Sequence, residues 1–553
     1  MAKMSGAQAL VECLSAQAVD TVFGVLGSTL LPVYDELYDH PRIQLIAPRG
    51  EDGALHMADA YARVTGKVGV GLITVGAGAA FSVSAMGEAW AESWPVLNIV
   101  TQIPTPYLDQ DKGVYHECHD QLGLFRPVTG WCRRIMHVGE IPAAIYEAFY
   151  RMQNGRPRPV MLEIPSDILR QEAEVAIPGP APRARPPVDK TAIRKAADLL
   201  AAAQRPVLWA GGGVVKAGAG AELKALAELL QAPVFGTNGS KGIVSDDHPL
   251  MFGNILTQSP LVEHDVFNKA DVVLALGTRF SERATRSTDK SAALLDVTGR
   301  SARGWTIKFP PQVIHADIDP GEFNRNVSTQ LPIHGDAKDV LQALLAELQA
   351  RRVEGRNRLE EIHTLKQAAR EALKKRVPAE IQLLEDLRAV LPRDAIVAAQ
   401  SIAGHWARYA LDMYEPGKFL FANTFGSMGF AFHAAIGAKI GCPSAPVVAL
   451  CGDGGFLFGC GELATVAHYK LNIPIVIFNN GGYKILQNTQ KRRYGRHIGT
   501  DLTSPDFVKL GEAFGFHAAR IEDLSTLAPA IGQALRRDRA TLIEVPVEFE
   551  PYR

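Results

Sequence analysis

The chain's 553 residues are too many for one hydrophobic core and predict about three domains of ordinary size. Its 58 Lys and Arg nearly balance 59 Asp and Glu, so charge favours neither nucleic acid nor a membrane surface as partner, and we expect a small molecule instead. The scattered cysteines show no CxxC pair and no zinc-like spacing with histidine. No apolar run reaches the ~20 residues of a membrane span and the first residues carry no signal-like stretch, so we expect a cytoplasmic protein.

Residues 1–175 predict an α/β domain with a parallel sheet. Short apolar runs, such as 68–75 and 96–101, alternate there with helix-like stretches. The proline-rich stretch 177–187 can continue neither a helix nor a central strand. It therefore predicts an extended linker that closes this first domain.

Residues 188–348 predict a second α/β domain, with strand-like runs at 206–210, 272–276 and 312–318. The glycines 211–213 follow the first of these runs, and such a turn alone is weak evidence for a nucleotide site. A dinucleotide-dependent dehydrogenase would need GxGxxG followed ~20 positions later by an acidic residue at a strand end. The sequence has no such arrangement.

A charged, helix-prone segment, 351–376, leads to a third α/β domain, residues 377–553. Its strand-like runs are 395–398, 447–450 and 473–478. The first and third domains alternate strands and helices in the same way, which is compatible with a structural relationship but does not establish one.

Two strands of the third domain end in polar, glycine-containing turns. One is followed by GDGG at 452–455 and the next by NNGG at 479–482. Because ligands bind where parallel strands end, Asp453 and Asn480 would offer oxygen ligands at one sheet edge, beside glycines that let phosphate approach. Mg²⁺ prefers such oxygens and usually shares them with a phosphate. The alternative, an ordinary turn and loop cap, is disfavoured by the pairing of the two turns.

GDG followed by NN after the next strand resembles the motif for thiamine diphosphate (ThDP) in the acetolactate synthase and pyruvate decarboxylase superfamily. Blocks at 22–34, 48–66 and 424–439 resemble the same family in the same order, so essentially the whole chain is covered. The resemblance implies a pyrimidine-binding, a central and a diphosphate-binding domain in succession. It also implies a homodimer or homotetramer with active sites at the subunit interface.

Glu51 follows the strand-like run 43–47 and precedes a helix expected to begin near Gly53. An acid there is ordinarily only a partner of the helix dipole. The resemblance instead implies that Glu51 promotes the imino form of the aminopyrimidine, which takes the proton from C2 of the cofactor. The resulting ylid, and later the enamine or carbanion, would carry the chemistry.

The resemblance also implies a set of binding residues. It assigns Asp453, Asn480 and Gly482 to Mg²⁺. Met428 would support the bent cofactor, with a role as core filler as the alternative. The full set of implied cofactor-binding residues is Gly27, Glu51, Ala403, Gly404, Gly426, Ser427, Met428, Asp453, Gly454, Gly455, Asn480, Gly482, Tyr483, Lys484 and Ile485.

His116 matches a position where acetolactate synthases and benzaldehyde lyase carry a glutamine that faces the substrate. A histidine there could donate or relay protons, and a surface or packing role is the alternative. Thr489 stands where acetolactate synthases have a substrate-selecting tryptophan, and Ser166 where they usually have lysine. Pyruvate with 2-oxobutyrate therefore does not follow from the resemblance.

The expected function is a ThDP- and Mg²⁺-dependent carboligase or synthase that acts on 2-oxo acids. The alternative is a non-oxidative 2-oxo acid decarboxylase or a hydroxyketone or hydroxyacyl lyase, with a 2-oxo acid or an aldehyde as substrate. A non-catalytic relative is disfavoured because Glu51, Asp453 and Asn480 are all retained. FAD in the central domain is allowed but not favoured, since the methionine- and histidine-containing segment of FAD-binding relatives is not evident after Gly253.

Overall fold

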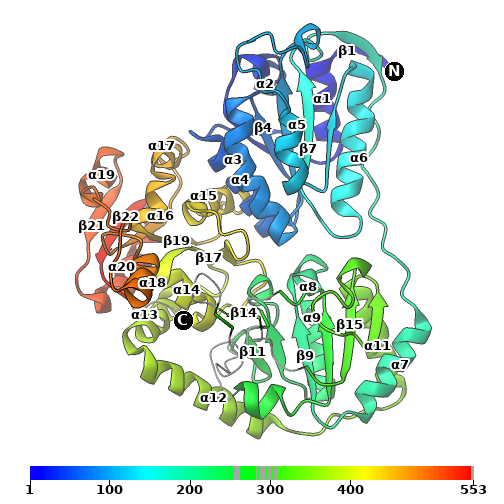
Figure 1. Cartoon of the computed structure of the whole chain (residues 1–553), viewed down its shortest axis with the longest axis vertical. Coiled ribbons are helices and arrows are strands. Elements are labelled where there is room, and N and C mark those ends of the chain that lie inside the picture. The colour runs from blue at the N-terminus through cyan, green and yellow to red at the C-terminus, as the bar shows by residue number, and fades with distance from the viewer. Residues whose placement is uncertain (254–261, 282–283, 286–293, 296–300, 304–308, 550–553) are drawn as a thin grey trace.

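Three α/β domains follow one another along the chain in the computed structural model (Figure 1). The structure describes residues 1–253, 262–281, 284–285, 294–295, 301–303 and 309–549. Each domain is built on a six-stranded sheet in which all neighbouring strands run parallel. The predicted fold class is therefore confirmed.

The N-terminal sheet has the strand order β3-β2-β4-β5-β7-β6. An antiparallel ribbon, which the sequence did not predict, pairs β1 (Ala2–Ser5) with β8 (Glu172–Val175). The strands of the main sheet are β2 (Thr21–Gly24), β3 (Gln44–Ile46), β4 (Gly69–Ile73), β5 (Val96–Gln102), β6 (Trp131–Arg134) and β7 (Val160–Pro165). The helices are α1 (Gly6–Ala16), α2 (Leu31–Tyr38), α3 (Glu51–Thr65), α4 (Ala77–Glu92), α5 (Gln121–Phe125) and α6 (Ile141–Gln153).

The central sheet has the order β11-β10-β9-β12-β15-β16. The strand order therefore reverses between β9 and β12: strands are added on one side of β9 first and then on the other. This 3-2-1-4-5-6 order is that of dinucleotide-binding folds, in which ligands bind outside the strand ends at the reversal. Its strands are β9 (Pro206–Ala210), β10 (Val234–Gly236), β11 (Met251–Gly253), β12 (Val272–Leu276), β15 (Gln312–Asp317) and β16 (Leu331–His334). Its helices include α7 (Lys190–Ala202), α8 (Gly212–Lys216), α9 (Gly220–Leu230) and α11 (Ala337–Ala350). The linker predicted at 177–187 contains neither helix nor strand.

The C-terminal sheet has the order β18-β17-β19-β20-β22-β21. Counted within each domain, this is the strand order of the N-terminal sheet, which supports the structural relationship that the sequence left open. Its strands are β17 (Ile396–Ala399), β18 (Phe419–Phe421), β19 (Val447–Gly452), β20 (Pro474–Asn479), β21 (His517–Arg520) and β22 (Thr541–Pro546). Its helices are α13 (Pro378–Val390), α14 (Ser401–Ala410), α15 (Phe430–Gly441), α16 (Asp453–Leu457), α17 (Leu463–His468), α18 (Lys484–Tyr494), α19 (Phe507–Ala513) and α20 (Leu527–Ala534), preceded by α12 (Leu359–Arg376).

The N- and C-terminal domains share one hydrophobic core, in which α3 packs directly against α15. Small residues make this close approach feasible. A side chain at Gly437 of α15 would overlap the backbone of Met57 in α3. This contact joins the two domains that carry the predicted site residues. Among the described helices, none is long and apolar enough to cross a membrane.

Candidate cofactor and substrate site

Glu51 is the first residue of α3, so the helix begins at Glu51 itself rather than near Gly53 as predicted. A side chain at Gly78 would come within 3.1 Å of Glu51 Oε1 and 2.8 Å of Thr74 Cγ2. A side chain at Gly27 would overlap the same threonine. Gly27, Glu51 and the turn before α4 therefore lie together at the carboxyl edge of the N-terminal sheet.

His116 lies at this edge as well. Its backbone has a left-handed φ of 68°, which is uncommon for a residue with a side chain. Gly76, the last residue before α4, leaves room for the His116 carbonyl, because a side chain there would overlap that oxygen. Buried Gln121 fixes the turn by accepting a hydrogen bond from Gly76 N at 2.8 Å. The structure thus brings His116 to the half of the site that contains Glu51.

The two polar turns of the C-terminal domain meet, because β19 and β20 are parallel neighbours. Asp453 begins α16 and is buried, and its Oδ2 accepts hydrogen bonds from Gly482 N at 3.0 Å and Ser504 Oγ at 3.3 Å. Burial raises the pKa of Asp453, although these hydrogen bonds oppose the shift. A nearby cation would therefore stabilise the charged form of Asp453.

Asn480 Oδ1 is buried and has no hydrogen-bond partner among the described residues. Buried polar atoms are nearly always paired, so an unpaired oxygen at a strand end is available as a ligand to a cation. A carboxylate and an amide oxygen at one edge suit Mg²⁺, which needs oxygen ligands and takes the remainder from phosphate and water. Asp453 and Asn480 therefore fit the metal and diphosphate that the sequence predicted.

The loop before α15 faces the same edge. Gly426 and Gly429 adopt left-handed φ values of 81° and 84°. Gln400 Nε2, at the end of β17, donates to Ser427 O at 3.0 Å and lies 3.9 Å from Met428 Sδ. Met428 is 39% exposed in the single chain, so its side chain is available to a ligand. Gln400 was not among the predicted site residues.

The start of α14 borders the GDGG turn. Ser401 has a φ of 91°, and a side chain at Gly452 would come within 2.8 Å of its Cβ. Ala403 is buried, and Gly404 is packed against Ala399 and Phe421. These two predicted residues can therefore reach a ligand through their backbone only. A side chain at Gly455 would lie 3.5 Å from Gln400 Oε1, which places the turn beside this segment.

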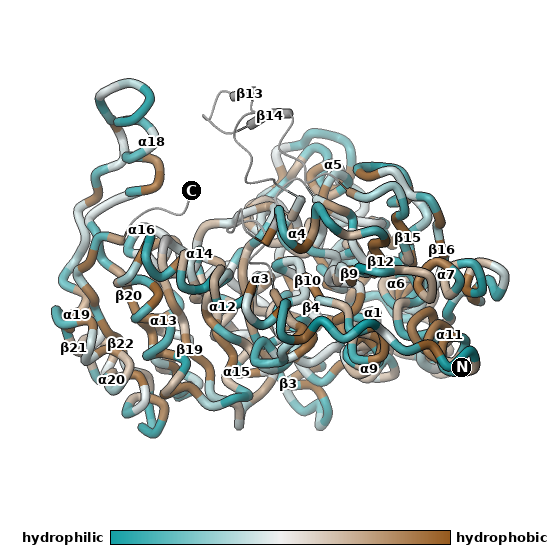
Figure 2. The backbone as a smooth tube through the Cα atoms, turned by 90° about the horizontal axis from the view of Figure 1, so that it is seen from below, coloured by the Kyte–Doolittle hydropathy of each residue, from teal (hydrophilic) through white to brown (hydrophobic). Residues whose placement is uncertain are grey.

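Residues 483–486 follow directly after the NNGG turn. A side chain at Gly454 would come within 2.6 Å of the Tyr483 ring. Lys484 Nζ donates to Gln487 Oε1 at 3.2 Å, Ile485 is partly buried against the C-terminal core, and Leu486 is exposed. The helix that they begin, α18, projects from the body of the domain (Figure 2). Thr489, the predicted replacement of the selecting tryptophan, lies on it.

The predicted residues fall into two groups in this chain, one half around Glu51 and one half around Asp453. Among the described residues, no hydrogen bond or ion pair joins Glu51 to Asp453 or to the loop before α15. Apolar side chains are exposed in both domains that carry these residues: Leu26, Leu31 and Phe81 in the N-terminal domain, and Phe425, Met428, Phe458 and Leu486 in the C-terminal domain.

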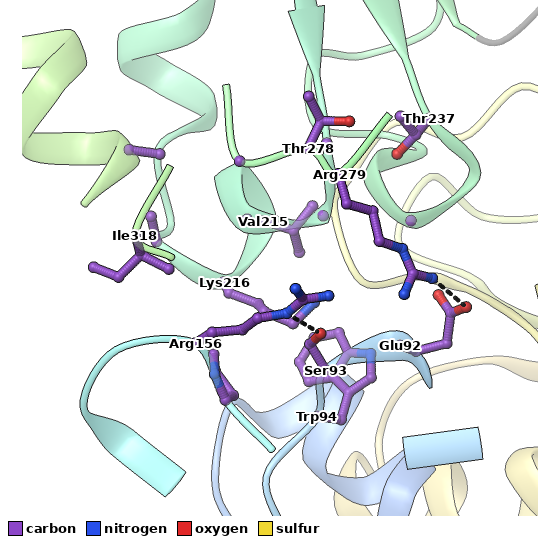
Figure 3. A pocket seen from close by; sticks show the side chains of 18 of the residues that line it. Glu92, Ser93, Trp94, Arg156, Val215, Lys216, Thr237, Thr278, Arg279 and Ile318 are labelled. Atoms are coloured by element: carbon purple, nitrogen blue, oxygen red, sulfur yellow. Dashed lines mark hydrogen bonds and ion pairs between the residues drawn. The ribbon is translucent and has the colours of Figure 1, made fainter. Parts of the chain in front are cut away.

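A cavity of about 280 Å³ lies where the three domains meet (Figure 3). Gly212, after β9, and Arg279, after β12, line it, and these strands border the reversal in the central sheet. Lys216 Nζ lies 4.1 Å from the centre of the Trp94 ring, and partial burial lowers the pKa of Lys216 to about 7. Glu92 Oε1 lies 4.0 Å from Arg279 Nη2.

Comparison with known proteins identifies the class. The description "thiamine pyrophosphate enzyme" matches this chain three times, as the N-terminal TPP binding domain at 4–124, the central domain at 193–344 and the C-terminal TPP binding domain at 401–545. The chain therefore belongs to the thiamine pyrophosphate enzyme family. It is a ThDP-dependent enzyme that forms or cleaves carbon–carbon bonds, as predicted.

Within this family the chain is acetolactate synthase-like. It is 34% identical to the probable acetolactate synthase large subunit of Methanocaldococcus jannaschii, over 99% of this chain and 92% of that protein. It is also 34% identical to the acetolactate synthase large subunit of Corynebacterium glutamicum, over 98% and 86%. The probable 2-ketoarginine decarboxylase AruI of Pseudomonas aeruginosa is 33% identical over 98% and 94%.

Proposed function

We propose that this protein is a ThDP- and Mg²⁺-dependent carboligase that releases carbon dioxide from a 2-oxo acid and joins the remaining acyl unit to a second carbonyl compound. The observation that carries the proposal is the buried, unpartnered Oδ1 of Asn480 beside Asp453, in a chain that retains Glu51. The relatives named acetolactate synthase support carboligation.

Each half-site has its own task in this proposal. Asp453, Asn480 and the Gly482 carbonyl hold Mg²⁺, and backbone amides of the glycine turn hold diphosphate. When bound, ThDP supplies a nucleophilic carbon and an electron sink. Glu51 exchanges a proton with the aminopyrimidine, and Met428 supports the ring. The remaining residues of the proposed binding set are Gly27, Ala403, Gly404, Gly426, Ser427, Gly454, Gly455, Tyr483, Lys484 and Ile485.

A decarboxylase or lyase is the second candidate, in which a proton takes the place of the second carbonyl compound. The position of His116 beside Gly76 supports this second candidate, since an imidazole there could deliver that proton. The similarity to a probable 2-ketoarginine decarboxylase also supports it.

The apolar side chains of Tyr483, Ile485 and Leu486 would accept an aliphatic or aromatic acyl substituent.

We further propose that the active unit is a homodimer, or a tetramer built from it, with each site shared between two chains. Large apolar side chains that are exposed in both domains, such as Phe81 and Phe458, are typical of surfaces that a partner covers. A second copy would bring the Glu51 half of one chain to the Asp453 half of the other.

All six cysteines are free, which supports the cytoplasm as the compartment.

For the cavity between the domains we propose an adenine nucleotide rather than FAD. The strand order and the glycines 211–213 suit a nucleotide phosphate. A volume of about 280 Å³ is at the lower limit for a drug-sized ligand and small for a flavin dinucleotide. Absorption near 450 nm in the purified protein would contradict this; a thermal shift with ADP that Gly212→Val abolishes would support it.

Product analysis tests the main proposal. The protein loaded with ThDP and Mg²⁺ is incubated with pyruvate and with larger 2-oxo acids, with and without an aldehyde, and the products are identified by NMR. Acetolactate or a mixed hydroxyketone is expected. Free aldehyde alone would replace carboligation by the decarboxylase alternative. Asp453→Ala serves as the control without activity.

A further inference from the structure

Glu462 of the C-terminal domain holds the segment that carries Glu51 in the N-terminal domain. It ends the short helical turn Cys460–Glu462, and its side chain is buried. Its Oε1 accepts hydrogen bonds from Arg49 N and Gly50 N, both at 2.9 Å. Thr465 Oγ1 donates to its other oxygen at 2.5 Å. The carboxylate thus fixes the two residues immediately before Glu51.

Glu88 of the N-terminal domain performs the reverse function. It lies on α4 and is fully buried. Its Oε2 accepts hydrogen bonds from Gly426 N at 3.0 Å and from Ser427 N at 3.3 Å. Ser84, one turn earlier on α4, lies 3.3 Å from Ser427 through the two hydroxyl oxygens. The carboxyl group thus fixes the loop in front of α15 that bears Met428.

The two glutamates occupy equivalent places in the two related domains. Each lies on the helical segment that follows the third strand of the six-stranded sheet in its own domain, β4 or β19. Each binds two consecutive backbone N–H groups in front of the helix that follows the second strand of that sheet in the other domain, α3 or α15. The contact between α3 and α15 therefore has an approximate internal twofold symmetry. Each domain contributes one carboxyl group that accepts hydrogen bonds from the other domain.

We propose that Glu88 and Glu462 are reciprocal positioning residues for catalysis, each of which orients the cofactor-binding segment of the opposite domain. This inference rests on the proposed function of Glu51 and of the 426–428 loop. Removing either acceptor leaves two backbone N–H groups without their hydrogen-bond partner in the protein. The segment then relaxes, and a displacement of about 1 Å at a reacting group is enough to cost ~100-fold in rate.

The proposal predicts crossed effects. Loss of Glu462, which belongs to the diphosphate-binding domain, should impair the proton transfer that depends on Glu51. Loss of Glu88, which belongs to the other domain, should weaken the binding of ThDP by the 426–428 loop. A role in folding alone would not separate these two quantities.

Glu462→Ala and Glu88→Ala are compared with the wild-type protein in two measurements. Calorimetry gives the ThDP affinity in the presence of Mg²⁺, and NMR gives the rate of deuterium exchange at C2 of ThDP at saturation. For Glu462→Ala we expect exchange slowed by about 10- to 100-fold with affinity within about threefold of wild type. For Glu88→Ala we expect affinity lowered by about 10-fold or more and exchange within about threefold.

Asp246→Ala is the matched control. Asp246 is buried and accepts a hydrogen bond from Met413 N of another domain at 2.8 Å, but it touches neither cofactor segment. Both quantities should be unchanged in this variant. Glu462→Gln and Glu88→Gln retain an acceptor oxygen and should recover both quantities to within about threefold. If an alanine variant does not fold, the aspartate variant, which withdraws the carboxyl group by one methylene, should show the same crossed effect.

The outcomes separate this inference from the proposed function. A wild-type protein that fails to bind ThDP would overturn the proposed function and this inference with it. A wild-type protein that binds ThDP, with variants in which both quantities fall together or neither changes, would overturn the reciprocal roles alone.

Discussion

At the scale of single residues, Glu51 begins α3 at a sheet edge, and Glu51→Gln replaces one oxygen by an amide nitrogen. The amide keeps the shape but cannot exchange a proton, so we expect ThDP affinity close to wild type and turnover lowered by about 10²- to 10⁴-fold. Calorimetry and steady-state kinetics measure the two. Turnover near that of wild type would contradict the role of Glu51. Asp453→Ala provides the contrast, since it should lose Mg²⁺-dependent ThDP binding.

Glu88 makes stability depend on pH. Burial, and next the nearby charge of Glu92, raise its pKa from 4.5 to about 8. Because the folded-state pKa lies above the unfolded one, its contribution is fully present below pH 4.5 and is lost as pH rises towards 8. We expect the free energy of unfolding to fall across this range in the wild-type protein and to fall less in Glu88→Gln. Denaturant titrations at several pH values measure this free energy. If it changed equally with pH in the two proteins, the raised pKa of Glu88 would be contradicted.

The site residues that the sequence predicted belong to short local patterns, such as Asp453 in GDGG. Gln400, Glu88 and Glu462 were missed because each acts on a different segment of the chain, outside its own local pattern. Glu462 binds residues more than four hundred positions earlier. A buried glutamate in an otherwise apolar helix is the signal that could have indicated Glu88, but only the fold names its partner.

At the scale of elements, the contact between α3 and α15 depends on glycine. A side chain at Gly437 would overlap the Met57 carbonyl oxygen. Alanine favours a helix by ~1 kcal/mol over glycine, but this backbone overlap should prevail. We expect Gly437→Ala to lower the free energy of unfolding by about 1–3 kcal/mol. Gly139→Ala, where no atom lies within 4 Å of the new methyl group, is the control. Equal stabilities in chemical denaturation would contradict this reading of the contact.

Strands were predicted more accurately than other elements, because buried parallel strands are continuous apolar runs between turns. The runs 206–210 and 272–276 correspond to β9 and β12 residue for residue. The charged segment 351–376 is helical only from Leu359, since charge and propensity do not mark a helix start without a cap. The pairing of β1 with β8 joins distant segments and left no local signal.

At the scale of the whole molecule, length and alternation sufficed to predict three α/β domains in order. They could not predict how the domains pack, which depends on surfaces from separate parts of the chain. The cavity where the domains meet illustrates this, since it is lined by Trp94, Lys216 and Arg279, which lie far apart in the sequence. The position of Glu51 and Asp453 in separate half-sites was likewise expected only through family resemblance.

The proposed sharing of sites between chains makes a quantitative prediction. In a heterodimer of Glu51→Gln and Asp453→Ala chains, one site carries both changes and the other carries neither. Random pairing makes half of the dimers mixed, so co-expression of the two inactive variants should restore about a quarter of the wild-type activity. Asp453→Ala with Asn480→Ala is the matched control, because both changes lie in the same half and every site stays defective. If each chain held a complete site of its own, neither pair would regain activity, and the two half-sites would have to close within one subunit.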